Sequence, residues 1–121
     1  MTLLIDSCQM TLTILEDTND LLFLELAGPL DISGTREIET RFLAHVASAA
    51  RPVIVDLSQV TFLASFGMRM IFDAIKSLDR KAKKLVMLNP HPAVAKVLEL
   101  GGVNEVAVIS FDEADARAKA L

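Results

Sequence analysis

Residues 52–72, PVIVDLSQVTFLASFGMRMIF, join a strand to a helix and decide the fold of this chain. PVIVDL at 52–57 is a nearly continuous apolar run, which is typical of a central strand covered on both faces of a sheet. The helix that follows has apolar residues at the i, i+3, i+4, i+7 spacing of one buried face: Ile71, Ala74, Ile75 and Leu78. A buried strand followed by an amphipathic helix is the building unit of α/β domains.

The rest of the chain predicts further units of the same kind. Short strands at 10–15 and 21–28 flank the polar stretch EDTND, which indicates an antiparallel hairpin. Two more strands are expected at 84–89 and 105–110. The expected order is β-β-α-β-α-β-α-β-α, so we predict an α/β fold with a mixed, mostly parallel sheet of about five strands and about four helices.

Helix ends and helix faces give the remaining local predictions. The first helix is expected to begin at Asp31 or Ser33, either of which can cap it. A short helix after His91 should stop at Gly101 and Gly102. Ser110 and Glu113 have the spacing of a capping box for the last helix. We expect one aliphatic core, and its predicted members are Ile38, Phe42, Val53, Val55, Ile71, Ile75, Leu85 and Val106.

Composition limits the class of protein. A chain of 121 residues, 52% hydrophobic and 5% aromatic, is expected to form a single domain over residues 1–121. Its net charge of −4 argues against a nucleic acid partner. A single cysteine, Cys8, and a start without a signal-peptide pattern favour a cytoplasmic location. No apolar run approaches the length of a membrane span, so we expect no membrane insertion.

Motifs for catalysis, metals or cofactors are weak in this sequence. His45, His91 and Cys8 show no metal-ligand spacing, and no glycine-rich phosphate-binding motif occurs, so we predict neither metal nor cofactor. The window around Ser65 has Gly67 but lacks the first glycine of a hydrolase G-x-S-x-G turn. We therefore predict a protein that binds a partner and is not an enzyme.

Asp56 raises the alternative of a receiver-like phospho-acceptor, because it is predicted to end a central strand. A receiver also needs an acidic pair after its first strand to hold Mg²⁺, and a lysine at the end of a late strand. The sequence has no such pair around Asp6 and no lysine in EVAVIS, so we expect Asp56 to be a structural residue.

Three stretches together resemble STAS domains: AGPLD (27–31), VIVDLSQVTFLASFGMRMI (53–71) and NPHPAVAKVLELGGV (89–103). These domains are the modules of bacterial anti-sigma factor antagonists and also occur in the tails of sulfate transporters. The resemblance extends over roughly residues 10 to 118, and without a transmembrane part the free-standing antagonist type is the closer match.

The resemblance implies a function for the turn at Ser65. The family's usual signature there is Asp-Ser-Ser/Thr-Gly-Leu, whose first serine is phosphorylated by a partner kinase that is often the anti-sigma factor itself. On this chain the phosphorylated serine falls on Ser65 and the glycine on Gly67, while Ala64, Phe66 and Met68 replace the other residues. The implied partner is an anti-sigma factor with serine-kinase activity. The implied partner-binding residues are Asp31, Ser33, Phe66, Gly67, Met68 and Arg69.

Several interpretations of the Ser65 turn and of Asp56 remain open at this point. Ser65 can be a plain helix cap, although a phosphate at a helix start would also be tolerated by the fold. The exchange to Phe66 favours a permanent hydrophobic contact, as in a STAS subunit of a lipid-transport ABC complex. The receiver-like acceptor at Asp56 and a homodimer also remain as alternatives.

Overall fold

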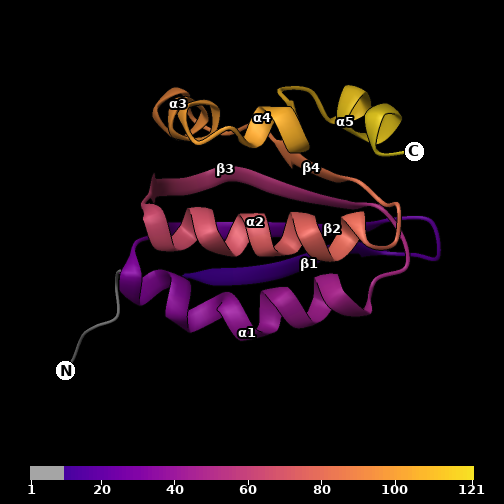
Figure 1. Cartoon of the computed structure of the whole chain (residues 1–121), viewed down its shortest axis with the longest axis horizontal. Helices are drawn as coiled ribbons and strands as arrows, with labels where there is room; N and C mark the ends of the chain where they lie inside the picture. Colours follow the sequence, from indigo (N-terminus) through magenta and orange to yellow (C-terminus); the bar gives the residue numbers. More distant parts are fainter. Residues whose placement is uncertain (1–9) are drawn as a thin grey trace.

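The computed structural model describes residues 10–121, and within them it contains one five-stranded sheet and five helices (Figure 1). The strands are β1 (Thr11–Asp17), β2 (Leu22–Leu30), β3 (Val53–Leu63), β4 (Leu85–Leu88) and β5 (Val108–Ser110). The helices are α1 (Ile32–Ser48), α2 (Ser65–Asp79), α3 (Pro92–Leu100), α4 (Val103–Val106) and α5 (Glu113–Ala120). The two residues Asp6 and Cys8, used above, lie outside the described part of the chain.

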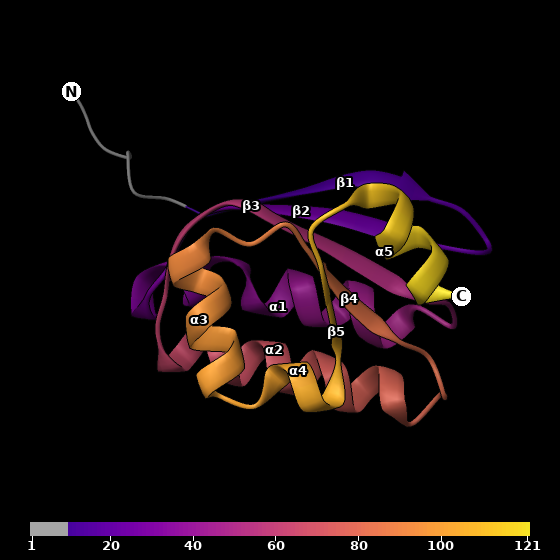
Figure 2. The same cartoon turned by 90° about the horizontal axis from the view of Figure 1, so that it is seen from above.

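The sheet is mixed, as predicted. Its strands lie in the order β1-β2-β3-β4-β5, with β1 antiparallel to β2 and the other neighbours parallel. The view from above shows α1 and α2 running side by side along the strands (Figure 2). The α/β prediction is therefore confirmed, and the helix beyond the predicted four is the four-residue α4.

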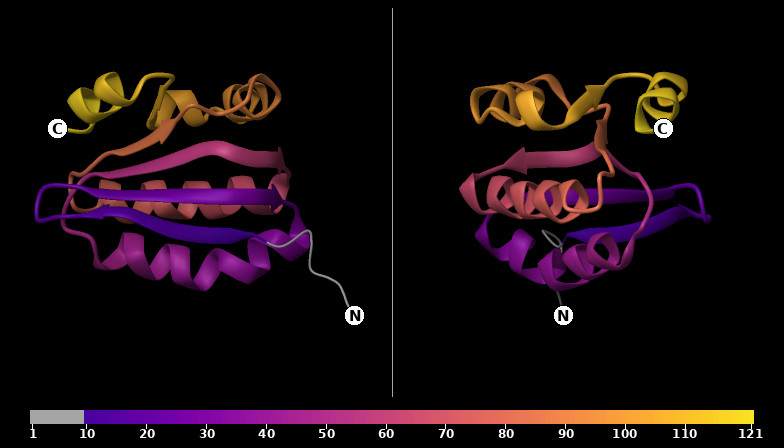
Figure 3. Two further views of the ribbon diagram at one scale, coloured as in Figure 1. Left: turned by 180° about the vertical axis from the view of Figure 1, so that it is seen from behind. Right: turned by 45° about the vertical axis from the view of Figure 1, so that its right-hand side comes forward.

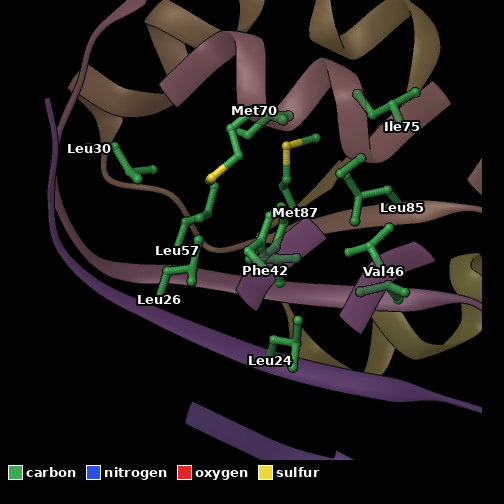
Figure 4. Packing of buried hydrophobic residues seen from close by; sticks show 14 of the residues in the cluster. Leu24, Leu26, Leu30, Phe42, Val46, Leu57, Met70, Ile75, Leu85 and Met87 are labelled. Carbon is green, nitrogen blue, oxygen red and sulfur yellow. The ribbon is translucent and has the colours of Figure 1, made fainter. Parts of the chain in front are cut away.

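Alternate residues of the strands feed two clusters on opposite faces of the sheet. The larger cluster lies beneath α1, α2 and α3, and the smaller one beneath α5. Figure 4 shows part of the larger cluster, where Met70 points from α2 toward Leu57 of β3. Seven of the eight predicted core residues lie in this cluster; Val106 does not. The core is thus divided in two by the sheet, because strand side chains alternate between its faces.

The strand predicted at 105–110 is wrong in its first half. Gly102 adopts a left-handed conformation with φ of 83°, which turns the chain immediately after α3. Val103–Val106 then forms α4, closed by a hydrogen bond of 2.9 Å from the Ala107 N–H to the Val103 oxygen. Val106 is 56% exposed and β5 begins only at Val108. The alternating apolar residues of 105–110 are therefore divided between the end of the helical turn α4 and the short strand β5.

Asp56 does not end its strand, contrary to prediction. β3 has 11 residues and continues to Leu63, so Asp56 lies in its first half. The pairing register of β3 with β2 shifts just beyond Asp56, and the Asp56 carboxylate accepts a hydrogen bond of 2.8 Å from the Ser58 N–H at this irregularity. The polar residues of the sequence DLSQ mark an irregular point in the sheet and not its edge.

The cap predicted for the last helix is also wrong. Asp112 caps α5 by accepting from the Asp115 N–H at 2.9 Å. Ser110 belongs to β5, is buried, and places its hydroxyl 2.7 Å from an Asp115 carboxylate oxygen. This hydrogen bond, helped by Lys119, holds the pKa of Asp115 below its ordinary value. Ser110 therefore fastens the first turn of α5 to the sheet without capping it.

Replacement of Ile71 by alanine tests the larger cluster. Ile71 is 2% exposed, so Ile71→Ala should lower the free energy of unfolding by ~2–4 kcal/mol, as large-to-small core changes do. The matched variant Ile32→Ala changes an isoleucine that is 49% exposed and should cost much less. Chemical denaturation of both variants measures the difference, and equal effects would show that the face of α2 has been misplaced.

Two glycine-to-alanine changes test how closely the elements approach each other. A Cβ at Gly34 would lie 1.9 Å from the backbone oxygen of Pro29, so Gly34→Ala must displace backbone and should destabilise the protein. A Cβ at Gly101 would meet the flexible end of the Met68 side chain at 2.2 Å, which can move aside. We expect a markedly lower melting temperature for Gly34→Ala than for Gly101→Ala. The reverse order would contradict this packing.

Candidate functional site

Two turns lie side by side where β2 and β3 end. Leu30 pairs with Leu63, and the Ala64 N–H donates to the Leu30 oxygen at 3.0 Å. Asp31 comes directly after β2, and Ser65 lies two residues after the end of β3. Both predicted site positions therefore lie at the carboxyl ends of these two strands. The carboxyl ends of parallel strands are a common place for binding sites in α/β folds.

Asp31, and not Ser33, caps the first helix. The Asp31 carboxylate accepts a hydrogen bond of 2.7 Å from the Gly34 N–H, and its backbone is extended, as a cap requires. Ser33 is exposed on the first turn of α1. The half-buried Asp31 therefore fixes the start of α1 beside the Ser65 turn, whereas Ser33 has a side chain that is open to contact from outside.

Ser65 is the first residue of α2 and not its cap. The cap position is occupied by Ala64, which has no side-chain oxygen, and no side-chain hydrogen bond caps this helix. The Ser65 side chain is exposed. The interpretation of Ser65 as a plain helix cap is therefore wrong, because the helix begins at Ser65 itself, one residue earlier than a cap at Ser65 requires. The backbone N–H groups at the start of α2 have no side-chain acceptor.

The other predicted site residues differ in how far they reach the surface. Phe66 is 40% exposed, Arg69 is exposed and Met68 is half-buried. Gly67 is buried: a Cβ there would lie 2.7 Å from a Leu63 methyl carbon and 2.9 Å from the Leu30 Cβ. Gly67 thus permits close packing of α2 on the sheet and offers no side chain to a partner.

Exposed apolar side chains lie at the same end of the fold as Ser65, and of these only Phe66 was predicted from the sequence as a contact residue. Besides Phe66, this end of the fold exposes 49% of Ile32, 53% of Phe62 and 79% of Leu100. We call Ile32, Phe62, Ser65, Phe66 and Leu100 the Ser65 surface. The signal for Leu100 was present in the sequence, since this leucine falls outside the buried face of α3.

A groove runs along the Ser65 surface between the start of α2 and the end of α3. It has a volume of about 390 Å³ and is lined by Leu63, Ala64, Ser65, Met68, Val97, Leu100 and Gly101. Its lining side chains are apolar apart from that of Ser65. Met68, predicted as a contact residue, forms part of the lining between the two helices. The arrangement suits an apolar side chain of another molecule and offers no acid–base pair for catalysis.

The receiver-like alternative finds no geometry to support it. Asp56 lies inside β3 with its carboxylate hydrogen-bonded to a backbone N–H, and its neighbour across the sheet is Glu25. Among residues 10–121, no group of three or more His, Cys, Asp or Glu side chains is placed to hold a metal ion. Likewise, no helix in this described range is long and apolar enough to cross a membrane.

Relatives of this chain include anti-sigma factor antagonists. The anti-sigma F factor antagonist of Lysinibacillus sphaericus is 24% identical over 87 residues, which cover 71% of this chain and 74% of that protein. The matching regions span 66% to 91% of the curated relatives' own lengths.

Solved structures of such antagonists share the fold of this chain. An anti-sigma factor antagonist from Mycobacterium paratuberculosis superposes with a TM-score of 0.80 at 22% identity, covering 92% of this chain and 93% of that one. Unphosphorylated SpoIIAA, another such antagonist, gives a TM-score of 0.72 at 21% identity, covering 92% of this chain and 98% of that one. Finally, the family model for the STAS domain matches residues 13–116, so this chain belongs to the STAS domain family.

Proposed function

We propose that this chain is an anti-sigma factor antagonist that binds its partner through the Ser65 surface. The observation that carries the proposal is an exposed serine on the first turn of α2, which lines an apolar groove and lies at the same end of a STAS fold as several exposed apolar side chains. The names of the relatives support the partner class, because they include antagonists of anti-sigma F and anti-sigma-B factors. The protein then acts by binding, and any ATP belongs to the partner.

The apolar part of the Ser65 surface supplies the affinity. Phe62, Phe66 and Leu100 each expose 40% or more of their surface at one end of the molecule. Contiguous exposed apolar groups are typical of protein interfaces, where a few large side chains carry most of the binding free energy. If an apolar side chain of the partner enters the groove beside Met68, the groove lining and that side chain are both removed from water. Asp31 and Ser33 at the start of α1 and Arg69 on α2 are polar residues at the same end of the fold, and they fit the polar rim of such an interface.

Phosphorylation of Ser65 is the proposed switch, with the anti-sigma factor acting as a serine kinase. The start of α2 offers backbone N–H groups without a side-chain acceptor, and the positive end of the helix dipole favours an anion there. The fold should therefore survive phosphorylation. The interface should not, because a phosphate brings nearly two negative charges into an apolar contact. SpoIIAA, which shares the fold, has been solved in unphosphorylated and phosphorylated forms.

A second candidate is a constitutive STAS subunit, of the type that would bind the ATPase of a lipid-transport ABC complex. The observation that favours it is the apolar character of the two residues that flank Ser65. Phe66 is 40% exposed and Ala64 is half-buried, so neither offers a polar group to a kinase. In this alternative the same surface binds permanently and Ser65 is not modified.

Charge at position 65 separates these two candidates. Ser65→Asp should weaken partner binding strongly, whereas Ser65→Ala should retain it and abolish phosphorylation by the kinase with ATP. Both variants should stay within ~0.5 kcal/mol of the wild-type free energy of unfolding, because the hydroxyl caps no helix and is exposed. Isothermal calorimetry, intact-mass spectrometry and melting curves measure the three quantities.

Thr40→Asp is the matched control, since it adds one negative charge to an exposed position in the middle of α1. It should leave partner affinity unchanged. Wild-type affinity for Ser65→Asp, together with no phosphate on Ser65 after incubation with kinase and ATP, would exclude the switch and leave the constitutive candidate.

Leu100 tests whether the groove belongs to the interface. Leu100→Ala should raise the dissociation constant of the partner about tenfold, or ~1.4 kcal/mol, with no loss of stability because the side chain is 79% exposed. Val106→Ala is the control: it shortens another exposed apolar side chain, on α4. Equal affinities for both variants would remove α3 from the docking surface.

A further inference from the structure

The outer edge of β1 is a second surface without a partner in the described chain. β1 pairs with β2 on one side only and forms one edge of the sheet. Five of its seven residues are exposed, including 43% of Ile14 and 48% of Leu15. The left view of Figure 3 shows the indigo hairpin of β1 and β2 facing the viewer, with α1 beneath it. Unpaired backbone N–H and C=O groups beside exposed aliphatic side chains can pair with another strand.

The two acidic side chains of β1, which could otherwise oppose pairing with another strand, form ion pairs within the same chain. Glu16 accepts from the Arg117 guanidinium of α5 at 2.8 Å, and this hydrogen bond holds the pKa of Glu16 below its ordinary value. Asp17 is paired with Arg51 at 2.6 Å. The strand TLTILED contains no lysine and no proline, the residues that commonly block edge pairing. Its two acids are thus neutralised by ion pairs within the same chain.

A bulge limits the length of regular edge that is available. The register between β1 and β2 shifts between Ile14 and Glu16, so Leu15 is an extra residue at this point. A bulge bends its strand and interrupts regular pairing. The regular edge is therefore Thr11–Ile14, in which both threonines and the isoleucine are residues that favour strands.

We propose that a second copy of this chain pairs with this edge, antiparallel along Leu12–Ile14, to form a homodimer. A twofold axis through Thr13 places Leu12 of one copy opposite Ile14 of the other and Thr13 opposite Thr13. Each pair points to one face of the joined sheet, as pleating requires, and both are favourable cross-strand pairs. Glu16 and Asp17 fall outside the paired stretch, so no acid faces an acid.

This geometry closes at two copies, because each dimer uses both β1 edges. The opposite edge, β5, has only three residues. Two short edges form a small interface compared with the roughly 1,200–2,000 Å² of stable complexes, so the dimer should dissociate on dilution. Each copy carries a net charge of −4, and salt should therefore strengthen the association by screening their repulsion.

Sedimentation velocity over a range of concentrations tests the proposal. The wild type should shift from monomer toward dimer as concentration rises, and more so at higher salt. Ile14→Lys, which brings a positive charge into the interface in both copies, should stay monomeric at every concentration. Leu15→Lys is a second edge variant, and melting curves confirm that each variant is folded.

Leu100→Lys is the control, since it adds the same charge to the Ser65 surface, where Leu100 is 79% exposed. This variant should dimerise like the wild type. A wild type that is monomeric throughout would overturn the proposal. So would a dimer that survives both edge variants, or one that is lost with Leu100→Lys, because the contact would then lie at the Ser65 surface.

Discussion

The parallel pairing of β2 with β3 is the constraint on which the candidate site depends. This pairing runs from Leu22 with Val53 to Leu30 with Leu63, and the last pair brings the two following turns together. The starts of α1 and α2 can approach this end of the sheet only because Gly34 and Gly67 have no Cβ, which would collide with Pro29 and Leu30 respectively. The place of Ser65 is therefore a consequence of strand register and of two close approaches.

The opposite end of the fold uses its charges for stability. Lys81 donates to the backbone oxygens of Ala47 and Ala49 at the end of α1. Lys84 lies within 3.5 Å of the backbone oxygens of Lys119 and Leu121 at the end of α5. Cations at helix C-termini satisfy free carbonyl groups and oppose the negative end of the dipole. The basic run 80–84 thus has a structural use, and the two ends of the molecule differ in chemistry: cations at one, apolar side chains at the other.

Burial explains which features could be predicted from the sequence. Ile38 and Phe42 were assigned correctly because a buried helix face imposes its period on the apolar residues. Helix caps were harder, since Ala64 and Ser65 are adjacent and only the backbone angles of Ala64 decide which residue precedes the helix. The helical turn α4 depends on the left-handed Gly102, and an apolar alternation does not reveal that conformation. Likewise, the Ser65 surface joins α1, β3, α2 and α3, whose proximity exists only in the folded chain.

The exchanges at the serine turn alter the proposed switch in a consistent direction. In the usual family pattern an aspartate precedes the serine, whereas Ala64 here leaves the first N–H groups of α2 without a side-chain acceptor and without a neighbouring negative charge. A phosphate on Ser65 would meet donors and no repulsion from that position, so its effect on the fold would be small. Phe66 affects partner binding and not folding. A partner that covers this apolar ring excludes the water that would otherwise solvate a new charge, so the charge weakens binding. Both exchanges would therefore direct the effect of phosphorylation onto the interface and away from the fold.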